Sequence, residues 1–155
     1  MERKQYEQEF VNKFYEYMTS SDKGIEFINH NCRAKKYADI EYRKANDLYR
    51  IEVKTHLSND RDNAAHKIFG ELLKMTKFDN DEKNNIHYGV LIDDRKVDSC
   101  TGSAFFSRKF NEFIDREKFL AFGKIFEELK VITFNPDTND KKEYSWEDFY
   151  NYTEE

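Results

Sequence analysis

The sequence of 155 residues contains little cysteine, no long apolar run and no excess of positive charge. Its two cysteines, Cys32 and Cys100, are too few for a disulfide framework or a cysteine-based zinc site, so we expect free thiols in a reducing compartment. No apolar run approaches the roughly 18 residues of a membrane-spanning helix, and the opening stretch MERKQYEQEF has no apolar segment typical of a signal peptide. These absences predict a cytoplasmic protein without a membrane segment.

The charge balance excludes one simple kind of nucleic-acid binding. The net charge of -5 results from 31 acidic and 26 basic residues, so there is no global basic excess of the kind that indicates nonspecific binding. A local basic groove and a site built from carboxylates remain compatible with this balance. Although 37% of the residues are charged, 16% are aromatic, and this aromatic content predicts a folded core rather than a disordered chain.

The pattern of apolar residues predicts one domain that covers residues 1–155, because no repeat, Ser/Gly-rich linker or long single-sign charge block interrupts it. One of the expected strands, YGVLI, is a nearly continuous apolar run, which is typical of a strand covered on both faces. The alternation of helices and strands predicts an α/β fold with a mixed sheet between helices. We expect helices at 3–19, 62–78, 104–128 (with a break at Gly123) and 146–152 (capped by Ser145), and strands at 38–43, 48–54, 88–92 and 131–134.

The segment with the clearest chemistry is a predicted hairpin that begins with YADI (37–40) and ends with RIEVK (50–54). Successive side chains of a strand alternate between its faces, so Glu52 and Lys54 project from the same face. In a symmetric hairpin centred between residues 45 and 46, Asp39 lies opposite Glu52, with their Cβ atoms about 5 Å apart. Two carboxylates at this spacing are destabilising unless a cation lies between them.

This grouping fits metal-assisted hydrolysis of phosphodiesters. Mg²⁺ is typically held by one or two carboxylates and keeps waters and phosphate oxygens as its other ligands. We therefore expect Asp39 and Glu52 to bind Mg²⁺ or Mn²⁺, with the backbone carbonyl of Val53 as a further ligand. Lys54 would orient the attacking water or stabilise charge on the phosphate.

The same residues resemble the signature of the PD-(D/E)XK nuclease superfamily, in which an acid on a hairpin is followed by Glu or Asp and, two positions later, by Lys. Asp39 matches the acid, and Glu52-Val53-Lys54 matches the second element, while Ala38 replaces the usual proline. The context of a preceding helix, a hairpin and a following helix extends the resemblance over about residues 1–95. The resemblance implies a restriction-endonuclease-like mixed central sheet flanked by helices, and a metal-dependent nuclease.

Two helices contribute further candidates. Many members of that superfamily place a Glu on the first helix beside the metal, and the helical wheel selects Glu7, which falls within the apolar stripe, whereas Glu9 and Glu16 fall on the opposite side. A stripe-edge acid paired with a lysine is the alternative interpretation of Glu7. On the helix after the hairpin, His66 is a candidate assisting residue, although a surface role is the alternative.

We therefore predict a Mg²⁺-dependent endonuclease that hydrolyses DNA. A chain of this size leaves no room for a separate recognition domain, so sequence specificity would depend on a homodimer, on loops or on a partner protein. The alternative function is a noncatalytic nuclease-fold module that binds nucleic acid or a partner protein. A third interpretation is a structural hairpin whose charged face is solvated.

Overall fold

A computed structural model describes residues 3–33, 37–57, 61–77 and 85–152, and its centre is one six-stranded mixed sheet in the order β1-β2-β3-β4-β5-β6. Strands β3, β4 and β5 are parallel to one another, and the remaining neighbours pair antiparallel. The elements in chain order are α1 (Arg3–Ser21), β1 (Ile25–Asn29), β2 (Ile40–Lys44), β3 (Asp47–Lys54), α2 (Arg61–Lys74), β4 (Asn85–Asp93), α3 (Gly102–Phe113), α4 (Arg116–Lys124), β5 (Leu129–Asn135), β6 (Asp140–Ser145) and α5 (Trp146–Tyr150).

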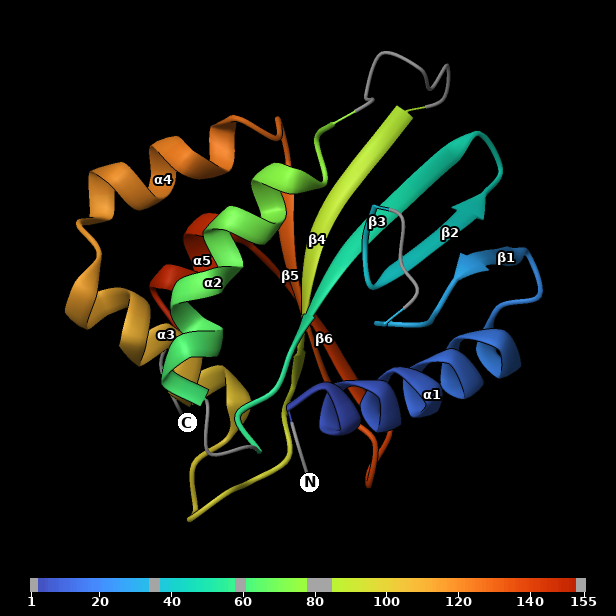
Figure 1. Cartoon of the computed structure of the whole chain (residues 1–155), viewed down its shortest axis with the longest axis horizontal. Coiled ribbons are helices and arrows are strands. Elements are labelled where there is room, and N and C mark those ends of the chain that lie inside the picture. Colours follow the sequence, from blue (N-terminus) through green and yellow to red (C-terminus); the bar gives the residue numbers. More distant parts are fainter. Residues whose placement is uncertain (1–2, 34–36, 58–60, 78–84, 153–155) are drawn as a thin grey trace.

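The helices lie on the two faces of the twisted sheet, with α1 on one side and the other four described helices gathered on the other (Figure 1). Alternating side chains of the central strands enter different cores, because a strand exposes successive residues to opposite faces. Val90 of β4 packs with α2 to α5, and its neighbour Leu91 packs with α1. The α/β prediction with a mixed sheet is therefore confirmed, as is the prediction that YGVLI forms a strand buried on both faces.

Two edge strands, β1 and β6, were missing from the predicted order. In β1 exposed and half-buried residues alternate, and in β6 none of the residues is fully buried. β1 has only five residues and includes Ile28, which is apolar but 48% exposed, and Tyr144 is the one aromatic or aliphatic residue of β6, so periodicity reveals neither strand. Residue 78, the last of the helix predicted at 62–78, lies outside the described residues; α2 itself ends at Lys74.

The predicted break at Gly123 was wrong. The interruption between α3 and α4 lies at Ile114 and Asp115, where Asp115 caps α4 by accepting a hydrogen bond from the Lys118 N–H. Gly123 instead permits close packing, because a Cβ atom at this position would lie 2.4 Å from Cδ1 of Trp146. The Trp146 ring stacks on Phe119, and the cap predicted at the start of the last helix is confirmed by Ser145, which accepts from the Asp148 N–H.

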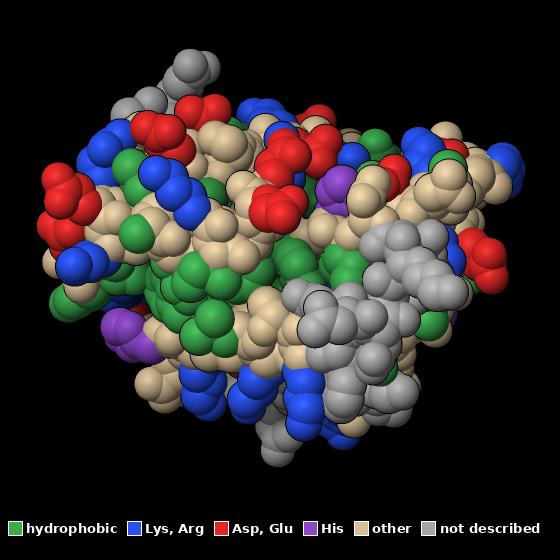
Figure 2. All heavy atoms as spheres, turned by 90° about the horizontal axis from the view of Figure 1, so that it is seen from above, with side chains coloured by type: hydrophobic (Ala, Val, Ile, Leu, Met, Phe, Trp, Pro, Cys, Tyr) green, Lys and Arg blue, Asp and Glu red, His purple; other side chains and the backbone are tan. Residues whose placement is uncertain are grey.

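The surface carries both signs of charge. Figure 2 shows acidic and basic side chains interspersed on the face seen from above, with a row of Lys and Arg side chains along the lower edge of that view. A chain of net charge -5 thus still presents local basic surface. None of the helices in the described ranges is long and apolar enough to cross a membrane.

Candidate metal centre

The β2–β3 hairpin brings Asp39 and Glu52 together as predicted. Ile40 pairs with Ile51, so Asp39, which immediately precedes β2, lies next to Glu52 of β3. The Val53 N–H donates a hydrogen bond of 2.9 Å to Oδ2 of Asp39 and fixes this carboxylate against the strand. Asp39 is fully buried and Glu52 is 1% exposed, so both acidic groups lie away from bulk water.

Lys54 lies on the same face of β3 and is buried as well. Its Nζ donates to Oε1 of Glu71 at 3.0 Å and lies 4.0 Å from Oε1 of Glu52. Glu71 belongs to α2 and was not among the predicted site residues. The same helical wheel that selected Glu7 would have found it, because Glu71 follows buried Ile68 by three positions and precedes buried Met75 by four.

Asp39, Glu52 and Glu71 form a three-carboxylate cluster, in which one oxygen of each group lies within 4.8 Å of the others. The pKa of Glu52 is raised well above its usual value, first by burial, then by hydrogen bonding to Asp39 and by the negative charge of Asp39. The ammonium of Lys54 counteracts this shift only in part. Without a cation, the cluster therefore keeps a proton at a pH where an exposed glutamate has lost it.

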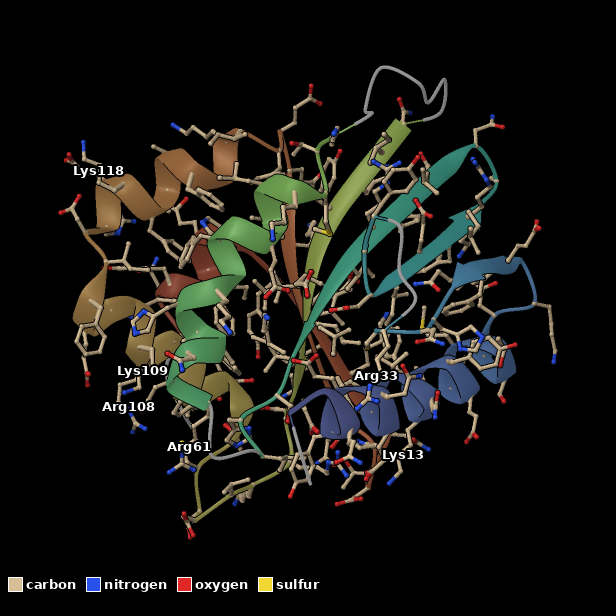
Figure 3. All side chains as sticks on the ribbon, viewed as in Figure 1. Lys13, Arg33, Arg61, Arg108, Lys109 and Lys118 are labelled. Carbon is tan, nitrogen blue, oxygen red and sulfur yellow. The ribbon has the colours of Figure 1, made fainter. Side chains whose placement is uncertain are left out.

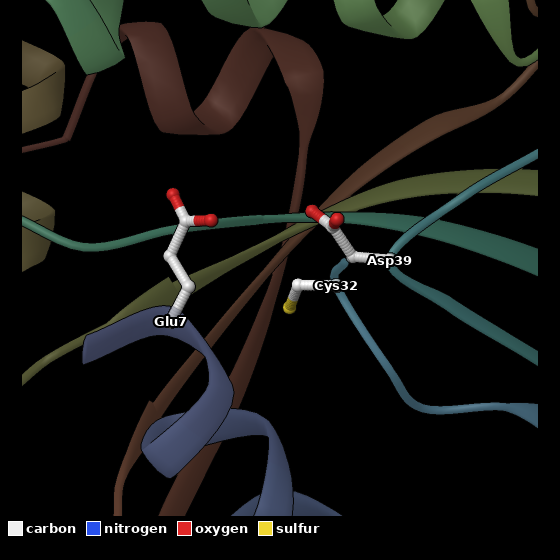
Figure 4. Close-up of side chains that lie close together, drawn as sticks. All are labelled: Glu7, Cys32 and Asp39. Carbon is white, nitrogen blue, oxygen red and sulfur yellow. The ribbon is translucent and has the colours of Figure 1, made fainter. Parts of the chain in front are cut away.

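A second group shares Asp39 with this cluster. The carboxylates of Glu7 and Asp39 and the thiol of Cys32 lie close together, each with one ligand atom within 4.8 Å of the others (Figure 4). Glu7 is 1% exposed, which confirms that this side of α1 faces the core. Cys32, expected from the sequence to be a free thiol, is 2% exposed and is held by its N–H, which donates to Oε1 of Gln8.

The other two glutamates considered on α1, Glu9 and Glu16, are less buried than Glu7. Glu16 is exposed, as the wheel predicted, but Glu9 pairs with Arg95 at 3.1 Å. Arg95 also binds both carboxylate oxygens of Asp93, which is fully buried at the end of β4. Arg95 thus connects α1, at a position two residues after Glu7, to the end of β4. The hydrogen bond from Arg95 is the main reason why the pKa of Glu9 is lowered.

His66 does not join the carboxylates. It is exposed on α2, where its ring meets Phe113 of α3 edge-on, with centroids 6.0 Å apart. His56, which follows β3, is buried, and its Nε2 lies 2.9 Å from the carbonyl oxygen of Cys100. Burial lowers the pKa of His56, and its ring stacks on Phe105 of α3, with centroids 5.8 Å apart.

The donor set of the cluster determines which ions it suits. Carboxylate oxygens are the preferred ligands of Mg²⁺ and Mn²⁺, whereas the thiol of Cys32 adds a softer ligand at the Glu7 end. Glu71 is the least buried member of the cluster, with 19% of its side chain exposed, although its Oε2 is itself buried. Comparisons of the chain with protein-family models, with curated proteins and with solved structures found no match.

Proposed function

We propose that the chain is a Mg²⁺- or Mn²⁺-dependent nuclease that hydrolyses phosphodiester bonds within DNA. The observation that carries the proposal is the buried cluster of Asp39, Glu52 and Glu71 with the ammonium of Lys54 among the carboxylates. If the hairpin and α2 had only a structural role, three negatively charged carboxylates so close together would lower the stability of the fold. A cation-binding role explains why they lie together.

The arrangement of elements supports the same proposal. A helix with a buried Glu, α1, precedes the hairpin, and α2, which contributes a further acid, follows it. The sheet is mixed, and the carboxylates lie where β2 begins and β3 ends. These features agree with the restriction-endonuclease-like fold that the resemblance to the PD-(D/E)XK nucleases implies.

In the proposed reaction, Asp39 and Glu52 hold the metal ion and Glu7 completes the acidic shell from α1. The N–H and C=O of a strand residue point to the same side, so the Val53 carbonyl points toward the side where its N–H reaches Asp39 and is available as a neutral ligand. A bound ion would lower the pKa of its water and neutralise charge on the phosphate.

Lys54 acts on the reacting atoms. Its Nζ lies between Glu52 and Glu71, so it is placed to orient the attacking water or to stabilise charge on the phosphate. The DNA backbone would approach from the side of Glu71, the partly exposed member of the cluster. Glu71 holds Lys54 in this position and thus sets its direction.

The direct test is incubation of the purified protein with supercoiled, linear and branched DNA in Mg²⁺, Mn²⁺ or EDTA. Cleavage in either metal and none in EDTA is expected. Asp39→Asn and Glu52→Gln should each lower the rate by about 100-fold or more, because each removes a ligand worth several kcal/mol in the transition state. Glu16→Gln, an exposed acid on α1, is the matched control and should cleave like the wild type.

Cleavage that persists in EDTA, or that Glu52→Gln leaves unchanged, would overturn the proposed site. DNA binding without cleavage in either metal would favour the noncatalytic module instead.

A further inference from the structure

The start of α2 and the exposed side of α3 form a basic surface near one end of the molecule, where Arg61, Arg108 and Lys109 lie together (Figure 3). Arg108 is exposed, and Arg61 and Lys109 are partly exposed. Segments 61–67 and 108–113 together contain four Lys or Arg residues and two acidic residues, Asp62 and Glu112. This local excess of positive charge contrasts with the net charge of -5 for the whole chain.

An aromatic ring stands among these cations. Phe113 is 63% exposed, and Nζ of Lys109 lies 5.5 Å from the centre of its ring. His66 of α2 meets the same ring edge-on. Beneath them, Phe105 lies 5.8 Å from the guanidinium of Arg61 and 5.6 Å from Nζ of Lys109. Exposed rings interleaved with cations are the elements that bind single-stranded nucleic acids, because bases stack on the rings and phosphates meet the charges.

The acids on this surface do not remove its positive character. Asp62 pairs with Lys109 at 3.1 Å, but its own side chain is 69% exposed, so solvent screens the pair. Arg108 donates to Sγ of Cys100, and sulfur is a weak hydrogen-bond acceptor. A phosphate would offer Arg108 a charged acceptor and hence a stronger hydrogen bond.

The surface is also close to the candidate metal centre. His66 and Glu71 lie on the same helix, and five residues of α-helix span about 8 Å along the axis. His66 and Glu71 are also about 140° apart around α2, so a DNA strand that contacts Phe113 and His66 would have to pass around this helix, over a few further nucleotides, to bring a phosphate to Glu71. The surface and the metal centre are positioned to bind one continuous strand.

We propose that this surface, formed by Arg61, His66, Arg108, Lys109 and Phe113, binds an unpaired DNA strand. A base stacks on the ring of Phe113, and the phosphates on either side pair with the cations. This inference rests on the proposed nuclease function, and it specifies the substrate as DNA with a single-stranded segment beside the cleaved bond, such as a flap or a branch.

The test measures binding separately from cleavage. Fluorescence anisotropy of a labelled single strand and of the matching duplex is recorded with the Glu52→Gln protein in EDTA, so that neither DNA is cut. The single strand should bind more tightly than the duplex. Phe113→Ala should weaken single-strand binding by about tenfold or more. Arg108→Gln should reduce the dependence of log affinity on log salt by about 0.7, the value for one phosphate contact on a single strand.

Two variants elsewhere on the surface serve as controls. Ile125→Ala removes an apolar side chain that is 59% exposed, and Lys118→Gln removes an exposed cation of α4, away from the basic surface (Figure 3). Both should bind like the parent protein. Equal affinity for single strand and duplex, or a Phe113→Ala variant that matches Ile125→Ala, would overturn the inference.

The two proposals fail separately. Tight, Phe113-dependent binding with no metal-dependent cleavage would reject the nuclease function and keep the binding surface. Cleavage that depends on Glu52 but is equally fast with Phe113→Ala on a flap substrate would reject the surface and keep the nuclease.

Discussion

Glu52 is a buried carboxyl group with two other carboxyl groups, Asp39 and Glu71, within 4.8 Å. Its raised pKa means that the folded, metal-free protein binds a proton more tightly than the unfolded chain does. The stabilisation from this proton is complete below the ordinary glutamate pKa and is lost as the pH rises through the raised pKa of Glu52. A metal ion requires the ionised form, so protons and metal compete for the cluster.

The metal-free protein should therefore lose stability as the pH rises from about 5 toward 8, and Glu52→Gln should lose less. Thermal melts across this range in EDTA measure the effect. Adding millimolar Mg²⁺ should raise the melting temperature of the wild type most at the upper end of the range, because metal binding then releases fewer protons. A pH profile of Glu52→Gln that matches the wild type would show that another group titrates.

Glu7 and Glu16 lie on the same helix but in opposite environments, which makes them a matched pair. Glu7→Gln should lower the cleavage rate at saturating DNA by about tenfold, because the loss falls on metal placement rather than on substrate capture. Glu16→Gln should not change the rate. Single-turnover rates at one Mg²⁺ concentration provide the comparison.

The reverse ranking would exclude Glu7 from the metal shell. Glu9→Gln, which the helical wheel grouped with Glu16, is a poor control, since its carboxylate pairs with Arg95.

At the scale of elements, two arginines hold the parts that carry the site. Arg50 of β3 donates to Glu41 of β2 and to the carbonyl oxygen of Met75, the residue that follows α2 by one position, so the hairpin and the end of α2 are fixed together. Arg95 connects α1 to the end of β4 through Glu9 and Asp93. The helices that supply Glu7 and Glu71 are thus anchored outside the carboxylate cluster, α1 by an ion pair with Arg95 and the end of α2 by a hydrogen bond from Arg50.

Arg95→Gln should destabilise the fold by about 3 kcal/mol, because it leaves the fully buried Asp93 carboxylate without its cation. Adding Asp93→Asn should recover part of this loss, since the uncompensated charge is then gone. Urea unfolding of the two single variants and the double variant measures the coupling between the residues. Additive losses would mean that the pair contributes nothing beyond its separate residues.

The sequence was most informative where a local pattern determines the element. The turn at Ala45 and Asn46 sets the register of the hairpin, so the meeting of Asp39 and Glu52 follows from counting outward from the turn. The apolar stripe of α1 likewise oriented Glu7 correctly. Ala45 itself has a φ of 55°, a conformation that turn residues of a tight hairpin adopt, although glycine is favoured there.

Local sequence patterns do not predict contacts between segments that are far apart in the chain. Cys32 approaches Glu7 because the residues after β1 are held to α1 by Gln8, and nothing in the cysteine's own sequence surroundings indicates this. The break between α3 and α4 depends on the cap at Asp115 rather than on a helix-breaking glycine. His66, the candidate assisting residue, lies away from the carboxylates because α2 turns its other side, with Glu71, toward the cluster.

At the scale of the whole molecule, the candidate site exists only in the folded chain. Glu7 belongs to α1, Asp39 immediately precedes β2, Glu52 belongs to β3 and Glu71 belongs to α2. These elements approach one another where β2 and β3 meet the two helical layers (Figure 1). Since Asp39 belongs both to the cluster with Glu71 of α2 and to the group with Glu7 of α1, an ion bound at Asp39 should stabilise contacts with helices on opposite faces of the sheet. The basic surface on α2 and α3 and the carboxylate cluster lie on different sides of α2, so a bound strand that reaches both would pass around this helix.

The most direct measurement is anomalous diffraction from crystals grown with Mn²⁺, because it locates the ion without relying on activity. A metal ion held by Asp39 and Glu52 should give an anomalous peak at bonding distance from their carboxylate oxygens, and the peak should be lost in crystals of Asp39→Asn grown in the same way. An anomalous map at saturating Mn²⁺ with no peak between these two residues would show that Asp39 and Glu52 do not form a metal site.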